Sequence, residues 1–203
     1  VARSMTRLRT YDRSDHLALD PTTQRNLELT TTMQGGREGS LLATIDHTVT
    51  APGGRRLREW LTRPRRDRSE LRRRHDCVGA LAGAALARER LRETLDDAYD
   101  LERLASRAAS GNADATALLR VRDTLAVLPD LADAVSSGRL AESPLSALVD
   151  GVDREAAADL HADLDSALAE DPPKTLTSGG LIRRGYDEEL DEILDEHEAA
   201  VKW

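Results

Sequence analysis

Residues 112–135 read NADATALLRVRDTLAVLPDLADAV, and this stretch decides the fold class. Its apolar residues return every three or four positions, which is the spacing of one face of an α-helix. Asn112 is a residue type that caps helix N-termini, and Pro129 predicts a kink or a stop in the helix. The residues of the predicted face are Ala115, Leu118, Leu119, Leu125 and Leu128, continued by Leu131 and Val135. The pattern indicates a helix that packs on other helices.

The same periodicity recurs along most of the chain and predicts an all-α, multi-helix domain. Helix starts are indicated at Asp20, which precedes a proline, at Pro52 and near Asp67, with a break or bend near residues 79–83. The final helix is expected to begin near Asp187. The residues expected to form the core are Leu57, Trp60, Leu61, Leu101, Leu104, Leu118 and Leu125.

The C-terminal residues predict two further features. Residues 174–186, KTLTSGGLIRRGY, are typical of a small β-hairpin that turns on residues 178–180. The helix after them carries an apolar stripe without a C-cap, and this stripe predicts self-association or fraying of the last turns. The stripe consists of Leu190, Ile193, Leu194 and Val201. A stripe that continues to the last residue, in a chain that opens without methionine, predicts a piece of a larger protein.

The composition bounds the class of protein. A chain of 203 residues with 39% apolar and 33% charged residues predicts one globular domain that buries ~70% of its unfolded surface. It has no apolar run long enough to span a membrane and no signal segment, so a cytoplasmic location is expected. The surplus of Asp over Lys predicts a salt-adapted source, with a GC-rich genome as the competing cause. The absence of Phe argues against a base-stacking platform.

Arginine is concentrated in residues 55–74, here called the basic strip. Ten of these twenty residues are Arg, whereas the whole chain has a net charge of −8. One interpretation is ion pairing with acidic helices or with neighbouring domains, and the other is direct contact with DNA phosphates.

Other motifs give weaker signals of chemistry. Asp96, Asp97 and Asp100 have the spacing that all-helical prenyl-transferring enzymes use for magnesium, but the alternative is that Asp96 and Asp97 start a helix. The glycine pairs match neither a phosphate-binding loop nor a dinucleotide fingerprint, and the histidines lack metalloprotease spacing. We therefore expect no catalytic, cofactor-binding or metal-binding residue.

Several blocks of sequence, taken in order, resemble the core domain of the MutS family of DNA mismatch-recognition ATPases. Arg56 and Arg65 depart from the apolar residues usual in that family at these positions. The blocks are LDPTTQRNLEL (19–29), GSLL (39–42), IDHTVT (45–50), GGRRLREWL (53–61), DLERL (100–104) and GLIRRGYDEELD (180–191). The resemblance covers nearly the whole chain.

The resemblance implies an all-α core or lever domain over residues 1–174, and a hairpin with the start of the lever helix toward the clamp over 175–203. It implies a lever that couples an ATPase domain to a DNA clamp, both outside this chain. The parent protein would bind mismatched duplex DNA, ATP and magnesium, form a homodimer, and contain connector, clamp and ATPase domains. Because the chain has no GKS or GKT motif and no Phe, this segment is expected neither to hydrolyse ATP nor to read a mispair.

DNA contacts within this segment are predicted at five arginines. They are Arg63, Arg65, Arg66, Arg183 and Arg184. The competing hypothesis is a free-standing helical interaction module that binds an acidic partner or nucleic acid through the basic strip, and a magnesium-dependent prenyl-type enzyme is the third.

Overall fold

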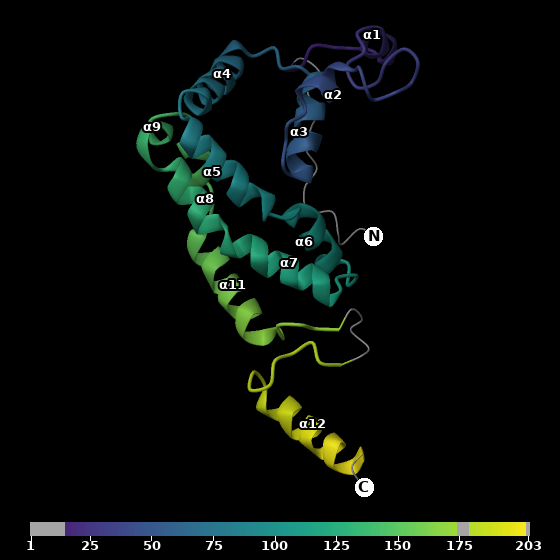
Figure 1. Cartoon of the computed structure of the whole chain (residues 1–203), viewed down its shortest axis with the longest axis vertical. Helices are drawn as coiled ribbons and strands as arrows, with labels where there is room; N and C mark the ends of the chain where they lie inside the picture. The colour runs from purple at the N-terminus through teal and green to yellow at the C-terminus, as the bar shows by residue number, and fades with distance from the viewer. Residues whose placement is uncertain (1–14, 174–178, 202–203) are drawn as a thin grey trace.

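The computed structural model describes residues 15–173 and 179–201, and these are mostly helical (Figure 1). Within these ranges there is no sheet, and β-pairing is limited to isolated bridges. No helix of the described part is long and apolar enough to cross a membrane. The helices are α1 (Pro21–Asn26), α2 (Leu41–Ile45), α3 (Ala51–Thr62), α4 (Arg68–Ala82), α5 (Ala85–Asp96), α6 (Leu101–Ala109), α7 (Ala115–Ala126), α8 (Leu128–Val135), α9 (Gly138–Ala141), α10 (Ser146–Asp150), α11 (Arg154–Ala167) and α12 (Glu188–Val201).

Polar caps and prolines set the helix boundaries. Asp20 caps α1 by accepting a hydrogen bond from the Thr23 backbone N–H at 2.7 Å. The cap of α7 is Asp114, which accepts from the Ala117 N–H at 2.8 Å, and not the predicted Asn112. Pro129 lies in the first turn of α8, so it separates two helices instead of kinking one, as its missing N–H and fixed φ favour.

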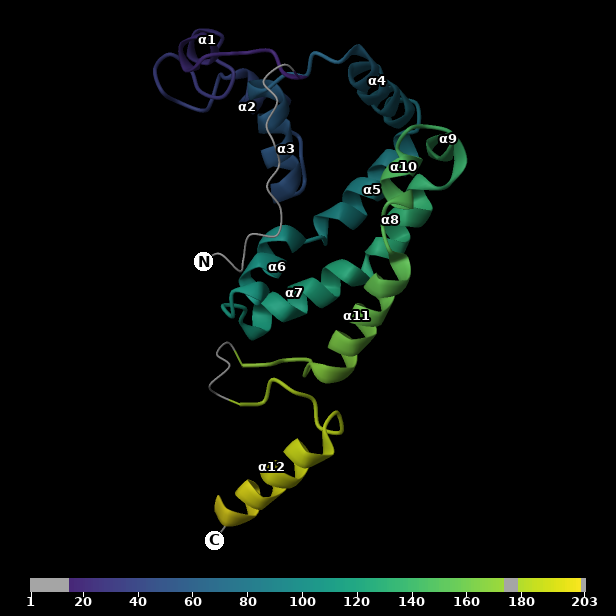
Figure 2. The same ribbon diagram turned by 180° about the vertical axis from the view of Figure 1, so that it is seen from behind.

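Helices α5, α6, α7, α8 and α11 pack together and form what we call the frame (Figures 1 and 2). Helix α11 packs on α7, α6 packs on the other part of α7, and α5 packs on α8. Most of the buried apolar side chains belong to these helices and their neighbours. They are Leu91, Leu104, Ala115, Ala117, Leu125, Ala132, Leu140 and Leu168, with Leu29 and Leu42 in a second group near α1 and α2. The frame is therefore the main hydrophobic core.

The predicted core residues differ in how deeply they are buried. Leu104 and Leu125 are buried, and the other leucines of the prediction are half-buried. Trp60 is 40% exposed, so the prediction that it belongs to the core is wrong. Helix α3, which carries Trp60, packs on α2 and lies to one side of the frame. The Arg74 guanidinium lies over the Trp60 ring, 3.9 Å from its centroid.

The predicted hairpin is not shown, and the pairing of this region within the described residues is one isolated antiparallel bridge, which joins Leu168 to Ile182. The Ala169 N–H donates to the Leu181 carbonyl at 2.9 Å, and the Arg183 N–H donates to the Ala167 carbonyl at 2.8 Å. The pairing partner is thus the end of α11. The first strand of the predicted hairpin and the first residue of its turn, residues 174–178, lie outside the described residues.

The chain is elongated, with α1, α2 and α4 toward one end and α12 at the other (Figure 1). It exposes 15165 Å², whereas a compact monomer of 22.2 kDa exposes about 9,400 Å². Since the unfolded chain would expose about 32,000 Å², folding buries only about half of that surface and not the expected ~70%. Large surfaces are therefore left for contacts with something other than this chain.

Candidate functional site

An ion pair joins α3 to the frame. Arg55 donates from its two terminal nitrogens to the Asp100 carboxylate, at 2.5 and 3.1 Å, across 45 residues of sequence. Asp100 also caps α6 by accepting from the Arg103 N–H. The hydrogen bond from Arg55 lowers the pKa of Asp100. Because the Asp100 side chain is only 13% exposed and bonded on both sides, its role here is structural.

Asp96 and Asp97 do not join Asp100 in a metal site. Asp96 is the last residue of α5 and Asp97 is its C-cap, so the expectation that the pair starts a helix is wrong. The helix start lies at Asp100 because its carboxylate reaches the free N–H groups of α6. Across residues 15–173 and 179–201, no group of three His, Cys, Asp or Glu side chains is placed to hold a metal ion.

Part of the basic strip is neutralised by its own acids. Glu70 accepts from Arg73 at 2.9 Å and from Arg74 at 2.7 Å. These hydrogen bonds lower the pKa of Glu70 from 4.5 to about 2. Arg56 pairs with Glu59 at 2.8 Å within α3. These arginines are therefore ion-paired within the strip itself, whereas Arg55 pairs with Asp100 at the start of α6.

Four other arginines of the basic strip are exposed and pair with no carboxylate of the described residues. They are Arg58, Arg66, Arg68 and Arg72. They extend from the middle of α3, through the connection to α4, to the first turns of α4. These four side chains are solvent-facing cations, which suits an anionic partner.

The structure does not bring the five predicted DNA contacts together. Arg63, Arg65 and Arg66 lie in the connection from α3 to α4, where Arg65 is half-buried and 3.7 Å from Asp15. The other two arginines lie in the turn before α12, near the opposite end of the molecule (Figure 1). A single short stretch of duplex would not touch both groups on one face.

We call residues 182–187, the turn that contains these two arginines, the α11–α12 junction. Arg183 donates from Nε to the Leu168 carbonyl at 3.2 Å, which ties the turn to the end of α11. Arg184 donates to Asp195 at 2.6 Å and to Glu198 at 2.9 Å, which ties the same turn to α12. The hydrogen bond to Asp195 raises the pKa of Arg184.

The first turn of α12 is held by the same junction. The Gly185 N–H donates to the Asp191 carboxylate at 2.7 Å, and the Leu190 N–H donates to the Asp187 carboxylate at 3.0 Å. These bonds cap the helix where sequence spacing predicted its start. Side-chain and backbone hydrogen bonds thus link α12 to the end of α11.

The apolar stripe of α12 has no extensive contact with another described helix. Ile193 is 57% exposed and Val201 is 72% exposed, while Leu190 and Leu194 are half-buried. An amphipathic helix that exposes its apolar face indicates a missing contact partner.

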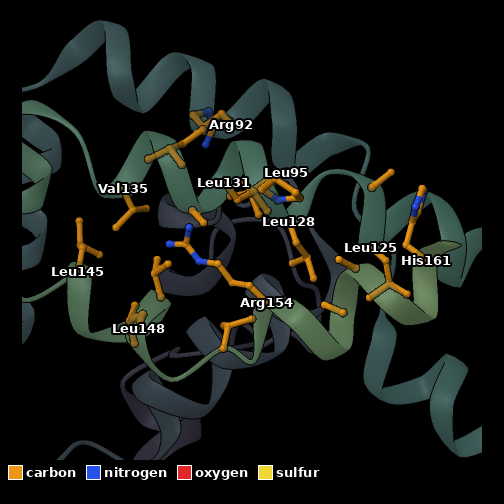
Figure 3. Close-up of a pocket in the computed structure, with 18 of the residues that line it drawn as sticks. Arg92, Leu95, Leu125, Leu128, Leu131, Val135, Leu145, Leu148, Arg154 and His161 are labelled. Carbon is orange, nitrogen blue, oxygen red and sulfur yellow. The ribbon is translucent and has the colours of Figure 1, made fainter.

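An apolar groove of about 730 Å³ lies between α5, α8, α10 and α11 (Figure 3). Its walls include Leu128, Leu131, Leu145 and Leu148, and basic side chains stand around it. Sequence reasoning missed this groove, although the run from Leu145 to Val152 is rich in apolar residues. The groove is lined mainly by apolar side chains from helices that lie far apart in the sequence.

Comparison with known proteins identifies a family for this helical chain. Residues 22–202 match the family MutS domain III. The chain is 64% identical over 201 residues to "DNA mismatch repair protein MutS 1" of Haloarcula marismortui, covering 98% of this chain and 22% of that protein. It is 62% identical over 204 residues to the protein of the same name in Halobacterium salinarum, covering 100% of this chain and 23% of that protein.

A more distant relative gives the same assignment. The chain is 45% identical over 205 residues to "DNA mismatch repair protein MutS" of Anaeromyxobacter sp., covering 99% of this chain and 22% of the relative. The chain thus spans less than a quarter of the length of these relatives. Its helical content and its match over residues 22–202 lead to one conclusion: the chain belongs to the MutS domain III family.

Proposed function

We propose that this chain is the core and lever segment of a MutS-type mismatch repair protein, and that it transmits motion between an ATPase domain and a DNA clamp outside it. The observation that carries the proposal is the α11–α12 junction. It connects a packed helical frame to a projecting helix through hydrogen bonds at both ends, so that rotation of the frame carries α12 with it.

The geometry suits transmission of motion better than chemistry. Helix α12 has 14 residues and extends about 21 Å from the junction. A small rotation of the frame is therefore amplified at the far end of the helix. The domain boundary near residue 174 separates the frame from the junction and α12.

The proposal gives the chain the partners of its parent protein. The parent would bind mismatched duplex DNA, ATP and magnesium, act as a DNA-dependent ATPase in the cytoplasm, and form a homodimer. This segment would contact the connector, clamp and ATPase domains, with no catalytic or cofactor-binding residue of its own. Exposed arginines after α3, Arg63 and Arg66, are the proposed contacts with DNA in this segment.

Substitution of Arg184 in the full-length parent tests the lever role. Arg184→Ala removes the bonds to Asp195 and Glu198, and we expect mismatch binding without nucleotide to stay unchanged while ATP-driven release slows about five-fold, the low end of typical coupling between sites. Arg90→Ala, at an exposed position of α5, is the matched control. Release at the wild-type rate in the Arg184 variant would contradict the lever role.

A second function is favoured by the unpaired part of the basic strip. Arg66, Arg68 and Arg72 are exposed without ion pairs in the described residues, which suits a helical module that binds nucleic acid or an acidic partner. The isolated chain would then bind a DNA duplex, and affinity would fall steeply between about 50 and 200 mM salt. Arg66→Ala with Arg68→Ala would flatten that salt dependence, whereas Arg90→Ala would not.

A further inference from the structure

We infer that residues 15–66 form an arm that swings on its connection to α4, and that three arginines latch this arm to the frame. The arm contains α1, α2 and α3, which lie to one side of the frame (Figures 1 and 2). The latch is a conformational device within this segment, and the inference does not depend on the lever role.

The arm folds around a small core of its own. Leu29, Ser40 and Leu42 are buried in it. The Leu42 N–H donates to the Leu29 carbonyl at 2.9 Å, which joins the end of α1 to the start of α2. Ser40 caps α2 by accepting from the Ala43 N–H at 3.2 Å. The arm therefore has the buried centre and the internal bonds of a separate folding unit.

Apolar packing between the arm and the frame is limited. Helix α3 has no buried residue, and the described helix with which it has extensive contact is α2, inside the arm. Helix α4, by contrast, packs on α5 of the frame and on α9. Two folded units that share a small interface move relative to one another unless specific bonds hold them.

Within the described residues the chain passes from the arm to α4 once. Residues 64–66 pair with residues 15–17 at the start of the arm. One of these bonds runs from the Arg66 N–H to the Asp15 carbonyl, at 3.0 Å. The next residue, Asp67, instead caps α4. The hinge is therefore the step from Arg66 to Asp67, at the end of a helix, where hinges are commonly found.

The first contact of the latch lies at the end of α3 that is far from this hinge. Arg55 donates from both terminal nitrogens to the Asp100 carboxylate at the start of α6. Because the Asp100 side chain is only 13% exposed, solvent and salt screen this pair less than a surface ion pair. A bidentate pair fixes orientation as well as distance, so it holds α3 at one angle to the frame.

Two further contacts run in the opposite direction, from arginines outside the arm to groups of the arm. Arg92 of α5 donates to the His47 carbonyl at 2.7 Å. The Arg74 guanidinium of α4 lies over the Trp60 ring near the hinge. Each contact depends on one guanidinium, so removing a single side chain weakens the latch and leaves the core of the arm and the core of the frame intact.

Distances between two spin labels on the 203-residue chain, measured by pulsed electron paramagnetic resonance, test the latch. Asn26→Cys places one label on the arm and Glu89→Cys places the other on the frame, both at exposed positions, and Cys77→Ser removes the native thiol. With the latch intact we expect one narrow distance distribution. Arg55→Ala should raise the population at other distances about ten-fold, as the loss of a hydrogen-bonded charge pair implies, and adding Arg92→Ala should raise it further.

Two other variants make the test specific. Arg56→Ala is the matched control, because the ion pair of Arg56 with Glu59 lies within α3, and it should leave the distribution unchanged. Asp100→Asn removes the charge but keeps an oxygen that can cap α6, so it should act like Arg55→Ala. Because both substitutions break the same bond, combining them should add little to the effect of either alone. Far-UV circular dichroism checks that each variant keeps its helices.

Three outcomes would overturn the inference. A broad distribution in the labelled chain with all three arginines in place would mean that the arm is not latched. A distribution that Arg55→Ala together with Arg92→Ala leaves unchanged would mean that packing, and not arginine, holds the arm. Equal broadening by Arg56→Ala would mean that the effect is not specific to bonds between the arm and the frame.

Discussion

Truncation of Leu104 tests whether the frame is the main core of the chain. Leu104 lies on α6, faces α7 and is 6% exposed. Leu104→Ala removes three carbon atoms, which costs about 2.4 kcal/mol of transfer free energy, and the cavity left behind adds to that cost. Because α6 is short and can relax toward α7, the cavity cost should be small, and we expect a loss of about 2.5–3 kcal/mol in the free energy of unfolding.

Leu86→Ala provides the matched control for this substitution. Leu86 lies on the neighbouring helix α5 and is 80% exposed, so the same chemical change should alter stability by no more than about 0.5 kcal/mol. Urea unfolding followed by far-UV circular dichroism measures both values. Chains of this length lose about 2–4 °C in melting temperature for each kcal/mol of stability, so the Leu104 variant should also melt about 5–10 °C lower. Equal losses for the two variants would refute the assignment of the core to the frame.

Three further predictions concern charge. Arg73 and Arg74 lower the pKa of Glu70 from 4.5 to about 2, so the stabilising contribution of Glu70 is present above pH 4.5 and is lost as pH falls toward 2. Glu70→Gln should therefore reduce stability at neutral pH and should match the wild-type stability in strong acid. Thermal melts across pH measure this. Arg55→Ala should raise the pKa of Asp100 toward its ordinary value, and NMR titration of the carboxyl carbon would show no change if the ion pair did not form in solution. The melting temperature of the chain should rise between low and molar KCl if the Asp-rich surface is a salt adaptation, and a flat response would favour GC bias as its cause.

Local chemistry explains what the sequence could predict. The stop at Pro129, the cap at Asp20 and the start of α12 at Asp187 each depend on residues within one helical turn, and the structure has them at those places. The helical pattern over residues 112–135 likewise identifies α7 and α8 without reference to the rest of the fold.

Long-range contacts explain the features that the sequence could not predict. Asn112 and Asp114 are both suitable caps, and the choice of Asp114 is supported by its ion pair with Arg107 at 3.2 Å. A periodic apolar face predicts that Trp60 contacts other residues, but it does not identify them. In the structure an arginine lies over the Trp60 ring. The groove is assembled from helices far apart in the chain, so no local pattern marks it.

The structure divides the chain into parts that are held by different forces. The frame is held by apolar packing, which depends little on orientation and resists deformation because interiors are close-packed. Helix α3 and helix α12 are joined to it by arginines, Arg55 on one side and Arg183 with Arg184 on the other. Arg55 and Arg184 bond to carboxylates and Arg183 bonds to a backbone carbonyl, and these contacts set an angle through hydrogen-bond geometry while burying little surface. A stiff body that holds a projecting helix at a set angle is the physical requirement for the proposed lever.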